Sequence, residues 1–214
     1  MPAGHHVTAW SETLTVIRFQ NQNAFETLLQ AVKGCTLCSG LPLGPNPILQ
    51  ASARSRILIA GQAPGRITHA RGRPFDDISG DRLRTWLGVD KDCFYDPDCF
   101  ALVPMGFCYP GTGTGGDLPP RPECAPAWRQ ALLDGMPGIQ LTVLLGQFAM
   151  RWHLGDQCGK NLTDAVSNWQ QFWPAQMPLP HPSPRNARWL KNHPQVEAEM
   201  LPSLKQRVRE ILDS

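Results

Sequence analysis

Residues 57–65 read Ile-Leu-Ile-Ala-Gly-Gln-Ala-Pro-Gly and decide how the rest of the chain can be arranged. The first four are apolar and mostly branched, which is typical of a buried strand. The Gly/Pro-rich remainder predicts a sharp turn where that strand ends. Ligands of open α/β sheets bind at the carboxyl ends of strands. The turn that begins at Gly61 is therefore a candidate binding site.

Further apolar runs predict three more strands, at residues 100–105, 141–145 and 177–180. Helical periodicity or composition predicts helices over 23–33, from about residue 79, over 124–134, after Gly146, and over 162–172, 187–192 and 195–212. Strands that alternate with helices favour a parallel sheet covered on both faces. We predict an α/β fold, a three-layer α/β/α sandwich with a central four-stranded parallel sheet.

The length of 214 residues suits one domain over residues 1–214, in which residues 1–20 lack clean periodicity and are expected to be an irregular or accessory segment. The sequence contains no apolar stretch long enough to span a bilayer and no signal-peptide pattern. We therefore expect a cytoplasmic protein, and we expect it to be a monomer. A net charge of +2 does not by itself indicate a nucleic-acid partner. Local groups of Arg and Lys follow residue 65 and residue 184, and are either phosphate contacts or ordinary solvated charges.

Four of the seven cysteines form two spaced pairs. Cys35 and Cys38 are a C-x2-C pair, and Cys108 and Cys124 bracket a Gly/Pro-rich loop, residues 106–123, that we expect to be irregular. Loops of this length are usually functional or held by something. Four thiolates suit a tetrahedral zinc ion or a [4Fe–4S] cluster. The alternative is four ordinary buried thiols.

Two further stretches stand out, Gly-Arg-Pro-Phe at residues 72–75 and His-Pro-Ser-Pro-Arg-Asn at residues 181–186. Together with residues 61–65 and the cysteine pairs, they resemble the uracil-DNA glycosylase superfamily, mainly its thermophile-type iron–sulfur branch. The sequence of residues 181–186 most resembles that of the single-strand-selective monofunctional branch. The resemblance implies a structural [4Fe–4S] cluster on Cys35, Cys38, Cys108 and Cys124, with zinc as the weaker alternative. Cys93, Cys99 and Cys158 do not fit the pattern and are interpreted as structural.

The resemblance also implies a role for each matched residue. Gln62, Ala63 and Gly65 would line the base pocket, and Phe75 would stack on a base rotated out of the DNA. His181 would donate a hydrogen bond to the base as negative charge develops on it. The residues implied to contact DNA are Ser183, Arg185 and Asn186.

The chain departs from the family pattern in three places. Gln62 stands where the iron–sulfur branch usually has Glu, and Ala63 stands where the most active branch has a water-activating Asp. Asp76 and Asp77 are the nearest carboxylates, and we assign catalysis to Asp77 together with His181 and Gln62; the alternative is that both are charges at a helix N-terminus. Pro104 replaces an asparagine that reads the uracil edge, which leaves the preferred base open.

The sequence thus predicts a monofunctional DNA glycosylase that removes a deaminated base, with uracil the first candidate, from DNA in base-excision repair. Neither motif contains a lysine, so a Schiff-base mechanism has no obvious nucleophile. One alternative is a catalytically weak or inactive iron–sulfur DNA-binding module of the same fold. A third interpretation is a small nucleotide-binding protein that is stabilised by a zinc ion.

Overall fold

A computed structural model describes residues 23–214 of the protein. The segment 1–20, for which the sequence predicts an irregular or accessory structure, lies outside the described residues. Residues 23–33 are helical, as their periodicity predicts.

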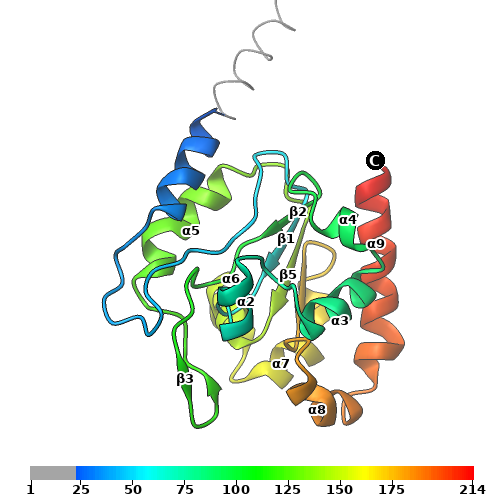
Figure 1. The fold of residues 1–214 in the computed structure, drawn as a ribbon. Helices are drawn as coiled ribbons and strands as arrows, with labels where there is room; N and C mark the ends of the chain where they lie inside the picture. Colours follow the sequence, from blue (N-terminus) through cyan, green and yellow to red (C-terminus); the bar gives the residue numbers. More distant parts are fainter. Residues whose placement is uncertain (1–22) are drawn as a thin grey trace, which may run out of the picture.

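The centre of the molecule is a four-stranded parallel sheet in the order β2-β1-β5-β6 (Figure 1). Its strands are β1 (Ile57–Ala60), β2 (Phe100–Leu102), β5 (Leu141–Leu145) and β6 (Gln176–Leu179). β2 ends before the predicted limit of residue 105. Pro104 has no N–H to donate, although Val103 and Met105 on either side still donate to the carbonyls of Ile59 and Gly61.

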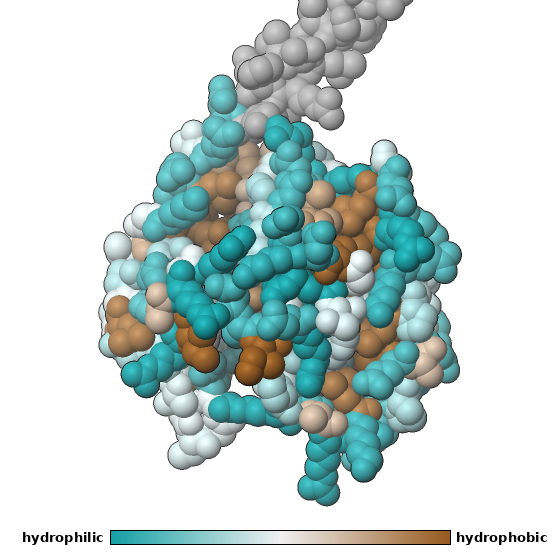
Figure 2. All heavy atoms as spheres, turned by 45° about the vertical axis from the view of Figure 1, so that its right-hand side comes forward, coloured by the Kyte–Doolittle hydropathy of each residue, from teal (hydrophilic) through white to brown (hydrophobic). Residues whose placement is uncertain are grey.

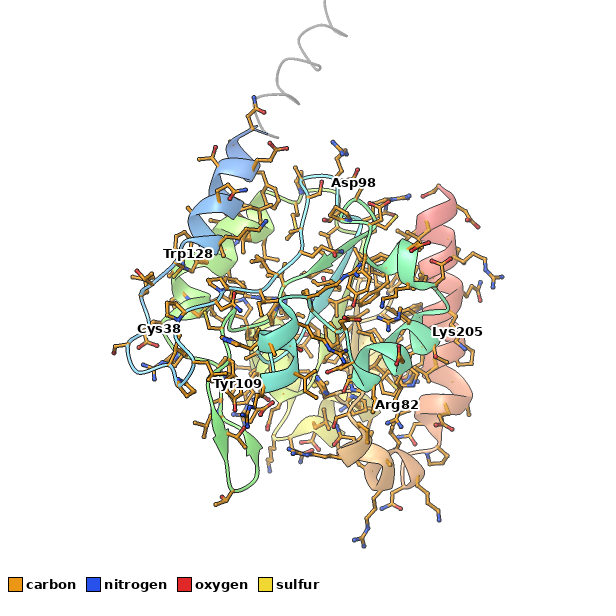
Figure 3. All side chains as sticks on the ribbon, in the orientation of Figure 1. Cys38, Arg82, Asp98, Tyr109, Trp128 and Lys205 are labelled. Atoms are coloured by element: carbon orange, nitrogen blue, oxygen red, sulfur yellow. The ribbon has the colours of Figure 1, made fainter. Side chains whose placement is uncertain are left out.

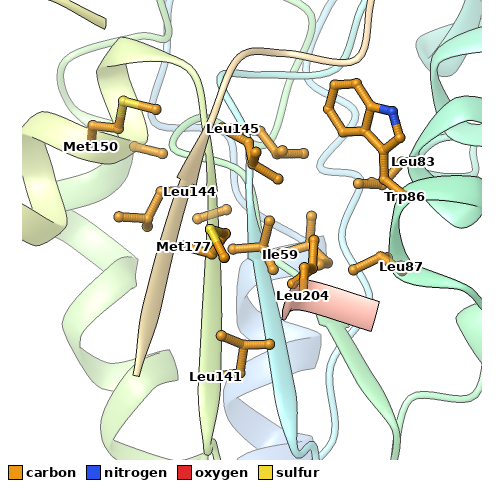
Figure 4. Packing of buried hydrophobic residues seen from close by; sticks show 14 of the residues in the cluster. Ile59, Leu83, Trp86, Leu87, Leu141, Leu144, Leu145, Met150, Met177 and Leu204 are labelled. Atoms are coloured by element: carbon orange, nitrogen blue, oxygen red, sulfur yellow. The ribbon is translucent and has the colours of Figure 1, made fainter. Parts of the chain in front are cut away.

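Helices cover both faces of the sheet, which confirms the predicted three-layer α/β/α sandwich. One face carries the 23–33 helix, α5 (Cys124–Asp134) and α6 (Gln147–Leu154), and the other carries α3 (Ile78–Leu87), α4 (Lys91–Phe94) and α9 (Leu201–Asp213). Figure 4 shows side chains of α3 and Met150 of α6 on opposite sides of the strands. The alternation of strand side chains explains this, because Ile57 and Ile59 pack in the cluster with α3 and α9 while Leu58 packs with Phe25 and Leu132.

The remaining helices are short. They are α2 (Arg66–Arg71), α7 (Leu162–Ser167) and α8 (Ala187–Lys191), together with 3₁₀ turns at Gly155–Cys158, Trp169–Gln171 and Pro184–Asn186 and a π turn at Val196–Met200 that leads into α9. The predicted 162–172 helix is therefore interrupted at Asn168. The sequence does not predict α2, which lies between Gly65 and a left-handed Gly72 and is too short for apolar periodicity.

The predicted irregular loop 106–123 contains regular structure, so that expectation is corrected. An antiparallel hairpin forms from β3 (Thr112–Gly113) and β4 (Gly116–Asp117), and Gly111 and Gly116 supply the positive φ angles of 110° and 127° that it requires. Figure 1 shows the hairpin projecting from the same end of the sheet as α8.

The surface shown in Figure 2 is largely hydrophilic with separate apolar patches. Within residues 23–214, no helix is both long and apolar enough to cross a bilayer.

Candidate functional site

A pocket of about 430 Å³ opens at the carboxyl ends of the strands. β1 connects to β2 on one side of the sheet and β5 connects to β6 on the other, so the pocket lies at a topological switch point, where open α/β sheets bind ligands. Every residue that the sequence assigns to catalysis, base binding or DNA contact lines this pocket: Gln62, Ala63, Gly65, Phe75, Asp77, His181, Ser183, Arg185 and Asn186.

Phe75 has an unusual backbone. Its φ is 53°, and no other non-glycine residue in the 23–214 range has a positive φ. Such a conformation costs on the order of 1–3 kcal/mol and persists only where neighbouring groups determine it. Here Tyr95 Oη donates to Pro74 O at 2.9 Å and Arg84 Nη1 donates to Phe75 O at 3.3 Å. The ring closes over Gly61, where an added Cβ would lie 3.6 Å from Phe75 Cζ.

His181 faces Phe75, with 6.2 Å between the ring centroids and 25° between the ring planes. The backbone N–H of Ser183 donates to His181 Nδ1 at 3.2 Å, which assigns the imidazole proton to Nε2. Burial lowers the pKa of His181 below its ordinary value, and the carboxylates of Asp77 and Asp117 oppose that shift. The imidazole is therefore a neutral donor near neutral pH.

The loop after His181 is stabilised by hydrogen bonds, most of them from side chains of the loop itself. Asn186 Nδ2 donates to His181 O at 2.8 Å, and Ser183 Oγ accepts from Arg185 N at 3.3 Å. Arg82 Nη1 adds a bond to Ser183 O at 3.3 Å. Of the three residues expected to contact DNA, Arg185 has the side chain that extends across the pocket mouth, where Nη1 lies against Gly116 of the hairpin.

The two carboxylates singled out in the sequence differ in position. Asp77 lines the pocket and is also the N-cap of α3, because its Oδ1 accepts from Gly80 N at 2.9 Å. This agrees with the alternative interpretation of a helix-terminal residue. Asp76 is not part of the pocket lining. Its Oδ1 lies 3.1 Å from Lys91 Nζ, and that bond lowers the pKa of Asp76.

Sequence reasoning missed a third carboxylate, Asp117 of β4, which lines the same pocket. Its Oδ1 accepts from Thr112 Oγ1 at 3.2 Å, and its Oδ2 would lie 3.1 Å from a Cβ built on Gly65. The residue after Asp117, Leu118, accepts a hydrogen bond at its carbonyl oxygen from Gln62 Nε2 at 2.9 Å. The one sequence signal was that Asp117 is the only acidic residue in 106–122.

The four paired cysteines line one narrow cavity beside the pocket. Three of their sulfurs accept N–H bonds: Cys35 from Trp128 Nε1 at 3.2 Å, Cys108 from Asn46 N at 3.4 Å and Cys124 from Phe107 N at 3.4 Å. Cys38, Trp128 and Tyr109 mark this side of the molecule in Figure 3. The free space between the cysteines is about 10 Å³. No group of three or more His, Cys, Asp or Glu side chains in residues 23–214 is arranged to hold a single metal ion.

Burial raises the pKa of the Cys38 and Cys108 thiols and raises that of Cys124 to about 12. Without a cation these cysteines are neutral thiols. A bound metal would change that, since coordination deprotonates a thiol outright. Cys93, Cys99 and Cys158 lie outside this cavity and pack in or against the main hydrophobic core.

The comparison with known families agrees with this geometry. A family model described as the uracil DNA glycosylase superfamily matches residues 49–205, well over half of the chain. The matched range contains the pocket residues from Gly61 to Asn186 and also Cys108 and Cys124, while Cys35 and Cys38 precede it. The match is to the superfamily as a whole, whose members are DNA glycosylases, hydrolases that act on DNA in repair. This chain belongs to the uracil DNA glycosylase superfamily.

Proposed function

We propose that the protein is a monofunctional glycosylase that hydrolyses the N-glycosidic bond of a deaminated base in DNA, with uracil as the first candidate. The observation that carries the proposal is the pair formed by Phe75 and His181, whose rings lie 6.2 Å apart at 25° across the pocket. One offers an aromatic surface and the other a neutral hydrogen-bond donor. An enzyme that acts on a base taken out of the DNA stack needs both.

The chemistry follows from these two side chains. A base rotated out of the DNA stacks on Phe75 inside the pocket. As its bond to the sugar breaks, negative charge develops on the base, and His181 Nε2–H donates to a base carbonyl oxygen. A donor fixed in advance stabilises the transition state more than the ground state. The lowered pKa of His181 suits this role, because a neutral imidazole is a weak acid that donates a hydrogen bond to the departing base and keeps its own proton.

Base selection falls to Gln62 in this proposal. Pro104 lines the pocket but offers no side-chain polar group, and its carbonyl already accepts from Arg129 Nη1 at 3.0 Å. Because Gln62 Nε2 donates to Leu118 O, its Oε1 is left to accept from a ligand. Uracil and hypoxanthine carry a ring N–H next to a carbonyl, where cytosine and adenine carry a lone pair. An acceptor at Gln62 therefore favours uracil over cytosine and hypoxanthine over adenine, whereas thymine and guanine, which carry the same N–H, must be excluded by the shape of the pocket.

We also propose that Cys35, Cys38, Cys108 and Cys124 hold a structural [4Fe–4S] cluster. The support is the donor set, four thiols around one cavity with N–H bonds aimed at three sulfurs. Each cysteine of a cluster binds its own iron, so the sulfurs need not converge on one point as around zinc. The cavity of about 10 Å³ requires the thiols to rotate outward, which the partly exposed Cys35, Cys38 and Cys108 allow. When bound, the cluster would link the chain at Cys35–Cys38 to both ends of the hairpin loop.

A second function, DNA binding without turnover, is favoured by one observation. Positions 62 and 63 carry no carboxylate, and position 104 carries no amide. A chain that kept the pocket and lost chemistry would bind damaged DNA and leave it intact.

A panel of labelled oligonucleotides separates the two functions. Single- and double-stranded substrates carry uracil, hypoxanthine or xanthine, and alkali converts any abasic product into a strand break. Protein purified anaerobically is expected to act on uracil or another deaminated base and to lose that activity in His181→Ala. Binding without cleavage of any substrate would make the DNA-binding module the correct account.

A further inference from the structure

We infer that Asp117, at the end of the hairpin, is the catalytic carboxylate that activates water at the sugar. This inference rests on the proposed function, since it names the group that completes the same site. The sequence motifs supply no carboxylate at positions 62 and 63, so the residue must come from elsewhere in the fold.

The position of Asp117 fits this role. Its Oδ2 points at Gly65 in the motif that follows β1, where an added Cβ would lie 3.1 Å from it. The side chain is exposed at the pocket mouth, while Phe75 and Gly61 line the interior against which the base would stack. A base inserted with its ring on Phe75 leaves its sugar at that mouth. The carboxylate and the reacting carbon would then meet at the same level of the pocket.

Asp117 is also fixed in orientation. Thr112 Oγ1 donates to Asp117 Oδ1 at 3.2 Å, and Tyr109 Oη lies 2.6 Å from the same Thr112 oxygen. This pair leaves Oδ2 for water. The bond from Gln62 Nε2 to Leu118 O holds the hairpin on the first motif. Both ends of the loop lie at cysteines, Cys108 directly before Tyr109 and Cys124 beyond the hairpin.

The other nearby carboxylates are committed elsewhere. Asp77 caps α3 through Oδ1, and its backbone directly follows the Phe75 segment. Asp76 pairs with Lys91 at 3.1 Å and with Arg71 at 3.9 Å. The charges of Asp77 and, to a smaller extent, Asp117 both act to raise the pKa of His181, so both carboxylates lie near the imidazole and the choice between them rests on the geometry of the hairpin.

The step balances as follows. The bond between C1′ and the base nitrogen breaks, and its electron pair leaves on the base, to whose oxygen His181 Nε2–H donates. Water forms the new C1′–O bond and passes a proton to Asp117 Oδ2. The base anion takes up a proton from solvent, and Asp117 returns its own to solvent. The products are an abasic sugar and the free base, with no further reactant.

The inference is tested by the single-turnover rate at which variants excise the base that the wild-type protein removes. The variants are Asp117→Asn, Asp77→Asn and Asp92→Asn. Loss of a positioned general base slows a reaction by about 10²–10⁴-fold, so we expect Asp117→Asn to fall in that range and Asp117→Glu to recover part of the rate. Asp77→Asn is expected to lose less than about tenfold, because Asn caps a helix as well as Asp. Asp92, exposed on α4 and absent from the pocket lining, is the matched control and should match the wild type.

Binding of each variant to DNA that contains an abasic site is measured in parallel. Asp117→Asn should bind at least as tightly as the wild type, since it removes a negative charge facing the phosphates. A normal excision rate in Asp117→Asn would overturn the inference and leave the glycosylase proposal standing. A loss of rate matched by an equal loss of DNA binding would also overturn it, by showing a structural role. If the wild-type protein removes no base, the proposed function fails and this inference fails with it.

Discussion

Gly80 of α3 lies directly against the backbone of Phe75, and a β-carbon on Gly80 would be 2.6 Å from the Phe75 carbonyl carbon. Position 80, in the first turn of α3, must therefore be glycine for Phe75 to keep its φ of 53°. A helix residue is thus constrained by the position of a pocket residue. The strained backbone and the missing side chain are two parts of one arrangement that aims the Phe75 ring over Gly61.

Gly80→Ala tests whether that arrangement matters. Ala normally stabilises a helix interior by about 1 kcal/mol relative to Gly. Here we expect the opposite, a lower free energy of unfolding and a slower excision rate, because the Phe75 backbone must shift. Urea unfolding and single-turnover excision measure the two effects. Thr85→Ala, on the exposed side of the same helix, is the control. A more stable Gly80→Ala protein with a normal excision rate would contradict the account.

A second expectation concerns acid stability. Arg129 is fully buried, and its Nη2 lies 2.7 Å from His153 Nε2. Burial, and then the charge of Arg129, lowers the pKa of His153 to about 3. Below its ordinary pKa of about 6.5 the unfolded chain binds a proton that the folded protein does not, so stability falls as the pH drops from about 6.5 toward about 3, by up to about 1.4 kcal/mol per pH unit.

His153→Gln keeps an acceptor for Arg129 and removes the titration. We expect the wild-type protein to lose about 2 kcal/mol more than this variant between about pH 7 and about pH 5. Urea unfolding at the two pH values provides the comparison. Equal losses in both proteins would show that His153 does not control acid stability.

The cysteine cavity gives a third expectation. Replacing Cys108 or Cys124 with Ser should remove the visible absorbance and most of the iron and sulfide of anaerobically purified protein. Cys93→Ser, outside the cavity, should retain them. If a colourless wild-type protein contains stoichiometric zinc instead, the cluster is excluded and the zinc alternative stands.

A fourth expectation concerns Arg185. Its guanidinium lies at the pocket mouth against Gly116, where DNA phosphates would approach. Arg185→Ala is expected to weaken DNA binding and to reduce the slope of log K against log salt by about 1, the value for one lost phosphate contact. Arg209→Ala on the exposed side of α9 should leave the slope unchanged. An unchanged slope in Arg185→Ala would remove this residue from the DNA-binding surface.

The strands and the pocket could be predicted from sequence because their signals are local. Residues 57–60 and 141–145 form uninterrupted apolar runs of strand length, and both are fully buried strands. The turn after β1 and the His181 segment lie at the carboxyl ends of parallel strands. The topology therefore brings seven of the nine predicted site residues into one pocket, and Phe75 and Asp77 join them from the segment between α2 and α3.

What sequence reasoning missed depends on contacts between distant segments. Asp117 reaches Gly65 only because Gly111 and Gly116 fold the loop into a hairpin, and loop composition does not reveal that geometry. The positive φ of Phe75 and the buried pair of Arg129 and His153 have no local pattern either. The helix α2 also has no local sequence pattern, because its six residues are too few to display a helical period.

The most direct test of the central claim is the single-turnover rate of uracil excision from single- and double-stranded DNA by the wild-type protein and by His181→Ala. Removal of one transition-state donor usually costs about 10²–10³-fold in rate. The account expects uracil or another deaminated base to be released by the wild type and the rate to fall by that factor in the variant, with binding to damaged DNA retained. Equal rates in the two proteins, or no release of any base by the wild type, would contradict it.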